Sequence, residues 1–305
     1  MEIRTTDYHT AGEPFRIVTD GAPALEGATV RERREHAIAS EEAEQVRRLL
    51  CHEPRGHADM YGCFLVPPDD DGADLGVLFW HKDGYSTACG HGTIALGVWA
   101  VESGVVAAPE DGEVEVTIDV PSGRVAARVR RRGGAVESVV FVNVPSYVVS
   151  RGDVDLAYGG ALYASVPASR FGLRVVPDDL PALIAAGRRI KSELADRDLY
   201  GTILWEELGP LHQRNVTIFA DGEVDRSPCG SGTSARCALL AAEGALREGE
   251  ELRHDSIVGT TFRARIVGST DEGVLTEVEG TAFRTGEHRF VLDPRDELGT
   301  GFVLR

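Results

Sequence analysis

Two cysteines of this 305-residue chain stand in nearly the same short motif, 140 residues apart. Cys89 lies in STACGHGTIALG, residues 86–97, and Cys229 lies in DRSPCGSGTSARC, residues 225–237. Each is followed by Gly, a variable residue, Gly and Thr, and then by apolar and Ala-rich residues that predict a buried helix. Each thiol is therefore expected at a helix N-terminus, beside unpaired N–H groups and the positive end of the helix dipole.

Such a helix N-terminus suits two tasks. Its N–H groups can hold a carboxylate, and they are expected to lower the pKa of the thiol from its usual value of about 8.5. If both helix N-termini face one cleft, one thiolate can remove the α-proton of an amino acid while the other thiol donates a proton on the opposite face. The motif pair therefore predicts inversion of an α-carbon without a cofactor and without a metal.

Two other classes of protein remain open at this point. A cysteine hydrolase needs one nucleophile and a paired histidine, but His91 is only two residues from Cys89, and the duplication would be unexplained. A non-catalytic amino-acid-binding protein could use the same carboxylate cradle without chemistry. Exchange of the α-proton of an amino acid for deuterium separates a racemase or epimerase from both.

The remaining cysteines carry no such motif. Cys51, Cys63 and Cys237 are expected to be inert core residues. The odd count of five, without a CxxC pair, predicts free thiols rather than a disulfide framework. The run CHEPRGH, residues 51–57, is followed by no second ligand pair, so no zinc site is expected.

The elements around the two motifs are also duplicated. Each motif helix precedes a Gly-centred hairpin and a further strand, in VEVTIDVPSGRVAARVR with VESVVFVNVP and in DSIVGTTFRARIV with VLTEVEGTAF. Two more helices are predicted at 41–50, after Ser40 as N-cap, and at 179–195, and a terminal strand is predicted in GFVLR. The simplest architecture is two pseudo-symmetric α/β domains, each wrapping strands around one buried helix.

Composition limits the partners. The formal net charge of −17 argues against nucleic acids and anionic membranes, which need a basic surface. The N-terminal residues lack the apolar segment of a signal peptide, and no apolar run reaches the length of a membrane span. We therefore expect a cytoplasmic protein with a small-molecule substrate, and a homodimer is left open.

Five motifs together resemble the proline racemase family over nearly the whole chain: DYHTAGEPFRIV, EPRGHADMYG, ACGHGTIALG, RNVTIFADGEVDRSPCGSGTSA and TGEHRFVLDPRD. The family includes proline racemase, 4-hydroxyproline 2-epimerase and trans-3-hydroxy-L-proline dehydratase. The resemblance implies a diaminopimelate epimerase-like fold, with a β-barrel-like sheet around each central helix. It also implies that the last strand returns to the first domain, which gives domains of 1–140 plus about 290–305, and 141–289.

The same resemblance assigns roles to residues. It makes Cys89 and Cys229 the acid/base thiols, and Asp225 the partner of the substrate's ring nitrogen. The carboxylate cradle would be formed by the backbone amides of Gly90, His91, Gly230 and Ser231. Tyr61 and Phe219 would lie beside the ring, and Trp205 would occupy the place of a substrate-binding histidine of 4-hydroxyproline epimerases.

The two thiols also bear on the reaction. The dehydratases of the family typically carry threonine at the position of Cys229, since loss of water can proceed with a single base whereas inversion needs two. We therefore expect a cofactor-independent 2-epimerase or racemase of 4-hydroxyproline or proline. The alternatives are a trans-3-hydroxy-L-proline dehydratase and a non-catalytic binding relative.

Overall fold

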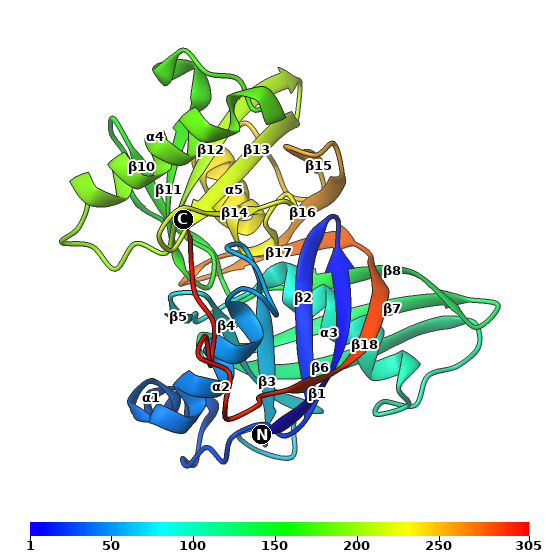
Figure 1. Ribbon diagram of the computed structural model, residues 1–305. Coiled ribbons are helices and arrows are strands. Elements are labelled where there is room, and N and C mark those ends of the chain that lie inside the picture. Colours follow the sequence, from blue (N-terminus) through cyan, green and yellow to red (C-terminus); the bar gives the residue numbers. More distant parts are fainter. Residues whose placement is uncertain (305) are drawn as a thin grey trace.

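The computed structural model describes residues 1–304, and the chain forms two lobes of mixed α/β structure (Figure 1). The first lobe contains residues 1–142 and 281–304, and the second contains residues 143–280, as judged from which strands pair with each other. In Figure 1 the second lobe lies at the top, in green to orange, and the first lobe lies below it with the red strand β18.

The first lobe is built from nine strands and three helices. Its strands are β1 (Glu2–Thr10), β2 (Glu13–Asp20), β3 (Gly62–Val66), β4 (Leu75–His81), β5 (Gly84–Tyr85), β6 (Gly112–Val120), β7 (Gly123–Arg132), β8 (Ala135–Val142) and β18 (Ala282–Val291). Its helices are α1 (Val30–Ala39), α2 (Glu41–Cys51) and α3 (Gly90–Glu102).

The second lobe has nine strands, two helices and two short 3-10 turns, at Ala168–Phe171 and Pro177–Asp179. Its strands are β9 (Tyr147–Ser150), β10 (Asp155–Tyr158), β11 (Leu162–Pro167), β12 (Gly201–Gly209), β13 (His212–Phe219), β14 (Glu223–Asp225), β15 (Glu251–Ser256), β16 (Thr261–Thr270) and β17 (Gly273–Gly280). Its helices are α4 (Leu180–Glu193) and α5 (Gly230–Ala242).

The two lobes correspond strand for strand. In the first, β2 and β3 are parallel, β3 and β4 antiparallel, and β4 and β6 parallel, with the small strand β5 beside β4. In the second, β11 and β12, β12 and β13, and β13 and β15 repeat this order, with β14 beside β13. The last parallel pair of each lobe is connected through the buried helix, α3 or α5. The predicted two-part architecture is thus confirmed.

Each central helix is enclosed by the strands of its own lobe. Helix α3 packs against β1, β2, β6, β7, β8 and β18, and α5 packs against β9, β10, β11, β16 and β17. Twelve of the thirteen residues of α3 are buried, as are eleven of the thirteen residues of α5. Burial on all sides favours Ala and Gly where a strand comes close, since a Cβ on Gly97 would lie 2.8 Å from the Ala127 Cβ. Ile94 and Leu96 reach between the strands into the core.

The other predicted helices are confirmed as α2 and α4, and the Ser40 hydroxyl caps α2 by accepting a hydrogen bond from the Ala43 N–H. Helix α1, capped by Thr29, was not predicted, because its arginines and glutamates show no amphipathic pattern. The predicted terminal strand at GFVLR is wrong within the described residues: Phe302 makes only an isolated bridge to Glu53.

The chain passes between the lobes twice, after β8 and after β17, and these two strands pair with each other at Val139–Val142 and Glu277–Gly280. Strand β18 pairs with β1 along its length, from Glu2 with Val291 to Thr10 with Ala282. The domain division remains a prediction, but these pairings lead us to place its second boundary near residue 281 rather than near 290.

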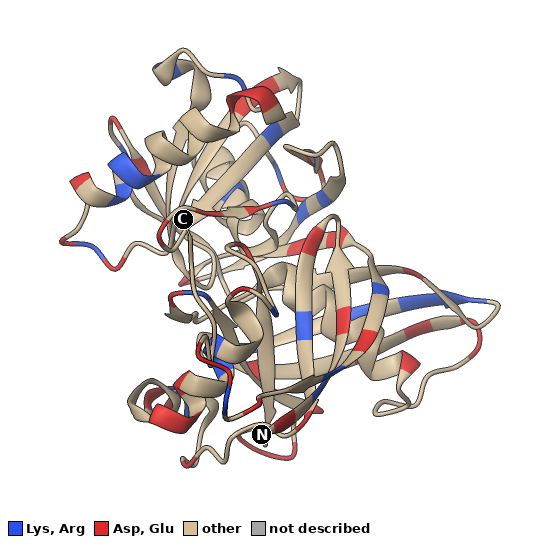
Figure 2. Cartoon of the chain, in the orientation of Figure 1, with Lys and Arg blue, Asp and Glu red and all other residues tan. Residues whose placement is uncertain are grey.

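Lys and Arg residues, like Asp and Glu residues, are distributed along the elements of both lobes (Figure 2). Within residues 1–304, no helix is long and apolar enough to cross a membrane.

Candidate active site

The N-termini of the two central helices touch each other. A Cβ atom built on Gly90 would lie 2.6 Å from the Cα of Gly230, and one built on Gly230 would lie 2.7 Å from the Cα of Gly90. Any side chain at either position would collide with the opposite backbone, so glycine is what permits this approach. The first turns of α3 and α5 therefore meet, and the duplicated motifs form one site between the lobes.

The two cysteines are the N-cap residues of α3 and α5, but their backbone conformations differ. Cys89 has an extended backbone, and its Sγ accepts a hydrogen bond from the Gly92 N–H at 3.2 Å, so the sulfur caps α3. Cys229 has a φ of 63°, in the left-handed region that non-glycine residues rarely adopt, and makes no side-chain cap. Its Sγ lies 3.9 Å from the Tyr163 hydroxyl, which is 2.6 Å from the Ser231 Oγ. The strained backbone at Cys229 marks a position that surrounding structure holds in place.

Both thiols are buried, each about 5% exposed. Burial raises the pKa of both thiols, and the charge of Asp225 raises it further. The pKa of Cys89 lies well above the ordinary range of a thiol. The expectation that the helix N-termini lower these pKa values is therefore wrong for the closed site. For Cys89, desolvation of a thiolate outweighs the bond from the Gly92 N–H, and both cysteines are neutral thiols in the closed site.

Asp225 and His91 lie between the two cysteines in the same buried site. The Asp225 Oδ1 accepts hydrogen bonds from the Ser227 N–H (2.8 Å) and hydroxyl (2.6 Å), while Oδ2 lies 3.9 Å from the His91 Nδ1. Burial raises the pKa of Asp225 to about 6 and lowers that of His91 to about 3. His91 is thus a neutral imidazole, with Nδ1 3.4 Å from the Cys89 Sγ.

Tyr61 and Phe219 lie side by side, as the resemblance implies, with ring centroids 5.8 Å apart. The Tyr61 hydroxyl contacts the hydroxyls of Ser86 and Tyr200, the latter at 3.0 Å, and the Tyr200 ring stacks on Phe219. The rings of His91 and Tyr61 are nearly perpendicular, with centroids 5.0 Å apart, so this aromatic group adjoins the thiol site. We call Tyr61, Phe219 and Tyr200 the aromatic wall.

Trp205 is not part of this wall. Its ring lies over the Arg236 guanidinium at 4.3 Å. The side chain that contacts Tyr61 and Phe219 is that of Tyr200, directly before β12. Trp205 packs against the cluster that contains Cys229, and its role at the place of a substrate-binding histidine stays a prediction.

The site is closed in this structure, because Cys89, Cys229 and Asp225 are all nearly inaccessible to solvent. A cavity of about 490 Å³ lies outside it between the lobes, lined among others by Ser86 and Tyr200, whose hydroxyls bond to Tyr61. The cavity is thus lined by one member of the aromatic wall, Tyr200, whereas neither thiol lines it.

Sequence reasoning missed Tyr163 and Tyr200. Both come from ordinary strand and loop segments without a motif, and they reach the site only through the folding of the second lobe. The remaining cysteines follow the prediction: Cys51, Cys63 and Cys237 are free and fully buried in the cores. Cys51 donates to the Met60 carbonyl, as expected of a structural residue of CHEPRGH.

Two buried thiols at touching helix N-termini, in a fold of two equivalent lobes, define the class of protein as an epimerase-type enzyme. The proline racemase family model matches residues 5–303, and the chain therefore belongs to the proline racemase family. It is an enzyme of an isomerase family.

Individual relatives are similar over nearly their whole length. A trans-3-hydroxy-L-proline dehydratase of Bacillus cereus is 43% identical, covering 98% of this chain and 97% of the relative. A 3-hydroxyproline 2-epimerase of Burkholderia multivorans is 42% identical, covering 99% and 98%. The crystal structure of a hydroxyproline epimerase from Agrobacterium vitis, with bound trans-4-hydroxy-L-proline, has a TM-score of 0.92 at 29% identity and covers 99% of this chain and 96% of that one.

Proposed function

We propose that this enzyme is a cofactor-independent 2-epimerase of a hydroxyproline, with Cys89 and Cys229 as the two acid/base groups. The observation that carries the proposal is the contact between Gly90 and Gly230, which joins the two helix N-termini that directly follow the buried thiols. A hydrolase mechanism would use one thiol only and would leave the second motif without a role.

The substrate would bind as a zwitterion. Its carboxylate accepts hydrogen bonds from the backbone N–H groups of Gly90, His91, Gly230 and Ser231, at the positive ends of α3 and α5. Its ring ammonium pairs with Asp225, which is ionised above the pKa of about 6. These contacts hold the α-carbon between the sulfurs.

Proton transfer then follows from the environment of the thiols. One cysteine is ionised while the lobes are apart and water reaches it, and closure then encloses the thiolate with the substrate. The thiolate removes the α-proton, the carbanion is stabilised by the N–H groups on its carboxylate, and the second thiol protonates the opposite face. The two cysteines exchange roles with each inversion.

The substrate's hydroxyl is recognised by the hydroxyl groups around the aromatic wall. Tyr61, Ser86 and Tyr200 form a buried polar cluster that proline cannot match, so we favour a hydroxyproline over proline. Sequence reasoning favoured the 4-hydroxy compound or proline. The relatives named for 3-hydroxyproline are 42–43% identical, against 29% for the 4-hydroxyproline-bound structure, and this favours the 3-hydroxy compound.

Dehydration of trans-3-hydroxy-L-proline is the second candidate, favoured by the names of several relatives. In this compound the carboxylate and the hydroxyl lie on opposite ring faces, so the α-proton and the hydroxyl share one face. The thiolate that removes the α-proton can therefore return it to the departing hydroxyl. The C–H and C–O bonds break, a C=C bond forms and water leaves. This route needs one thiol, whereas epimerisation needs both.

Proton NMR in D₂O tests both reactions with L-proline, trans-4-hydroxy-L-proline and trans-3-hydroxy-L-proline. Epimerisation gives α-deuteration and the signals of the other epimer. Dehydration gives a product whose spectrum lacks the α-proton signal and the signal of the proton on the hydroxyl-bearing carbon. We expect Cys89→Ser and Cys229→Ser each to abolish epimerisation, with unchanged circular dichroism. Any dehydration should survive in one of the two variants. Absence of α-proton exchange with all three compounds would overturn the proposed function.

A further inference from the structure

A short segment of the second lobe is bound to the first lobe at every second or third residue. This segment, residues 221–226, contains β14 with Asp225 and lies just before Cys229; we call it the strap. Its backbone N–H groups donate to three carboxylates of the first lobe: Asp221 to Asp83 (2.7 Å), Val224 to Asp59 (3.0 Å) and Arg226 to Glu13 (2.7 Å). The position of the strap therefore reports whether the lobes are closed.

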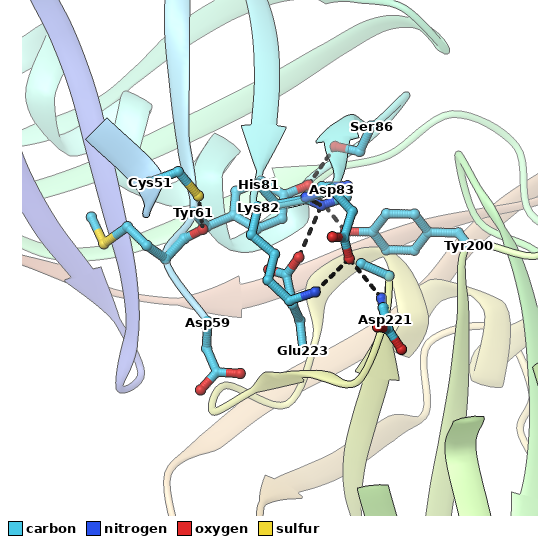
Figure 3. A network of polar contacts seen from close by, with 12 residues as sticks. Cys51, Asp59, Tyr61, His81, Lys82, Asp83, Ser86, Tyr200, Asp221 and Glu223 are labelled. Carbon is cyan, nitrogen blue, oxygen red and sulfur yellow. Dashed lines mark hydrogen bonds and ion pairs between the residues drawn. The ribbon is translucent and has the colours of Figure 1, made fainter. Parts of the chain in front are cut away.

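One further contact of the strap joins two buried side chains. The His81 Nδ1, at the end of β4, lies 3.0 Å from the Glu223 Oε1 in β14 (Figure 3). The side chains are 9% and 0% exposed. Since β4–β5 and β13–β14 are the equivalent hairpins of the two lobes, this pair forms where the duplicated elements meet.

The pair is a buried hydrogen bond between the two lobes. The Asp83 N–H also donates to the His81 Nδ1 at 3.2 Å, so the imidazole is held by the β4–β5 turn as well as by Glu223. The second oxygen of Glu223, Oε2, is buried and has no partner, which a neutral carboxyl tolerates better than a carboxylate. Burial also raises the pKa of Glu223.

The imidazole of His81 also supports the aromatic wall. Its ring centroid lies 5.7 Å from those of Tyr61 and Phe219 and 6.3 Å from that of Tyr200. His81 thus contacts all three members of the wall while it bonds to the strap. Loss of the His81–Glu223 bond would therefore alter the packing of both the strap and the aromatic wall.

The same residues do not favour a cation. Ligand atoms of His81, Asp83 and Glu223 lie within 4.8 Å of one another. However, the ammonium of the buried Lys82 is 2.6 Å from Asp83 and already supplies the positive charge (Figure 3). A second cation would meet that ammonium in a buried setting.

We propose that His81 and Glu223 are positioning residues whose hydrogen bond holds the strap closed over the two thiols and keeps the aromatic wall in place. Closure thus depends on a side-chain bond between the equivalent hairpins, in addition to the backbone contacts of the strap. The kinetic part of this proposal rests on the proposed function, whereas its effect on closure does not.

Access to the thiols tests closure without a substrate. The full-length protein is treated with iodoacetamide at one fixed pH, and alkylation of each cysteine is followed by mass spectrometry of peptides. In His81→Phe and Glu223→Leu, which remove the bond, we expect Cys89 and Cys229 to react about tenfold faster than in the wild type. Cys51, Cys63 and Cys237 should stay unreactive, because all three are fully buried in the cores.

Two further variants sharpen the test. Glu223→Gln can donate its amide N–H to Nδ1 and should keep the alkylation rates within about threefold of wild type. His212→Gln removes a histidine–carboxylate pair inside the second lobe, His212 with Asp255 at 2.7 Å, and should likewise change nothing at the two thiols. Wild-type alkylation rates in both His81→Phe and Glu223→Leu would overturn the proposal. So would faster alkylation of all five cysteines, because the pair would then support the fold and not closure.

Turnover gives an independent readout. A weakened bond leaves the closed state less populated, so substrate binding must shift more of the protein toward closure. In Glu223→Leu we therefore expect KM to rise about tenfold while kcat changes less than threefold. A loss confined to kcat would contradict the proposal. If no compound is turned over by the wild type, the proposed function fails, and the alkylation rates still decide the role of the pair.

Discussion

Replacing Gly90 by alanine tests whether the two helix N-termini are in contact and whether this contact matters for chemistry. The new Cβ would lie 2.6 Å from the Gly230 Cα, 2.7 Å from the Ser231 N and 2.8 Å from the Gly230 C. Ordinary contacts begin at 3.4 Å, and all three atoms belong to the backbone, which cannot rotate away. The helix N-termini must separate by about 1 Å, and a displacement of that size in a catalytic site costs about 10²-fold in rate.

Stability supplies a second measure of the same change. Alanine by itself favours a helix over glycine by up to about 1 kcal/mol. Overpacking against a rigid backbone costs about 1–3 kcal/mol, and we expect this cost to prevail. Gly90→Ala should therefore lower the melting temperature by a few degrees and lower kcat/KM for α-proton exchange about 100-fold.

The matched control is Gly152→Ala, since a Cβ there meets nothing within 4 Å and the backbone is not left-handed. This variant should melt and turn over like the wild type. Wild-type exchange rates in Gly90→Ala, measured by NMR in D₂O, would refute the contact as the basis of the site. A stable variant with no exchange would show that the contact matters for chemistry only.

Two further substitutions test the electrostatics and the specificity of the site. Burial raises the pKa of Asp225 from 3.8 to about 6, so the folded state binds its proton more tightly, and Asp225 lowers stability as the pH rises from about 4 through 6. Asp225→Asn should therefore gain stability relative to the wild type over this range, by up to about 3 kcal/mol at pH 7.5, although it should be inactive. Urea denaturation at pH 4 and pH 7.5 measures the difference in the free energy of unfolding. A difference that does not depend on pH would contradict this prediction. Tyr61→Phe should lower kcat/KM for the hydroxyproline substrate about tenfold, from a lost bond of about 1–2 kcal/mol, and leave proline unchanged or improved. Equal effects on both compounds would mean that the Tyr61 hydroxyl only shapes the aromatic wall.

The sequence was most informative where a local pattern decides the structure. The two Cys-Gly-x-Gly-Thr motifs predicted helices that begin after Cys89 and Cys229, and the structure has them at α3 and α5. The repeated hairpins predicted two equivalent lobes, which the strand pairing bears out. These features depend on residues close together in the chain.

Properties set by the tertiary environment could not be predicted in the same way. The pKa of Cys89 depends on how completely the second lobe covers it, and no local pattern reports burial. Tyr200 enters the aromatic wall because β12 begins beside β11 and β13, not because of its neighbours in sequence. Trp205, five residues further on, lies over the Arg236 guanidinium instead.

The pairing of β18 with β1 has a consequence for synthesis of the protein on the ribosome. Strand β1 is made first, but its partner along one edge is completed only at Val291. Until then the nascent first lobe has an open strand edge, and unpaired edges of this kind can pair with other chains. Contacts between such distant residues also slow folding. We therefore expect the first lobe to finish folding only after residue 291 has been made, so that it depends on chaperones longer than the second lobe does.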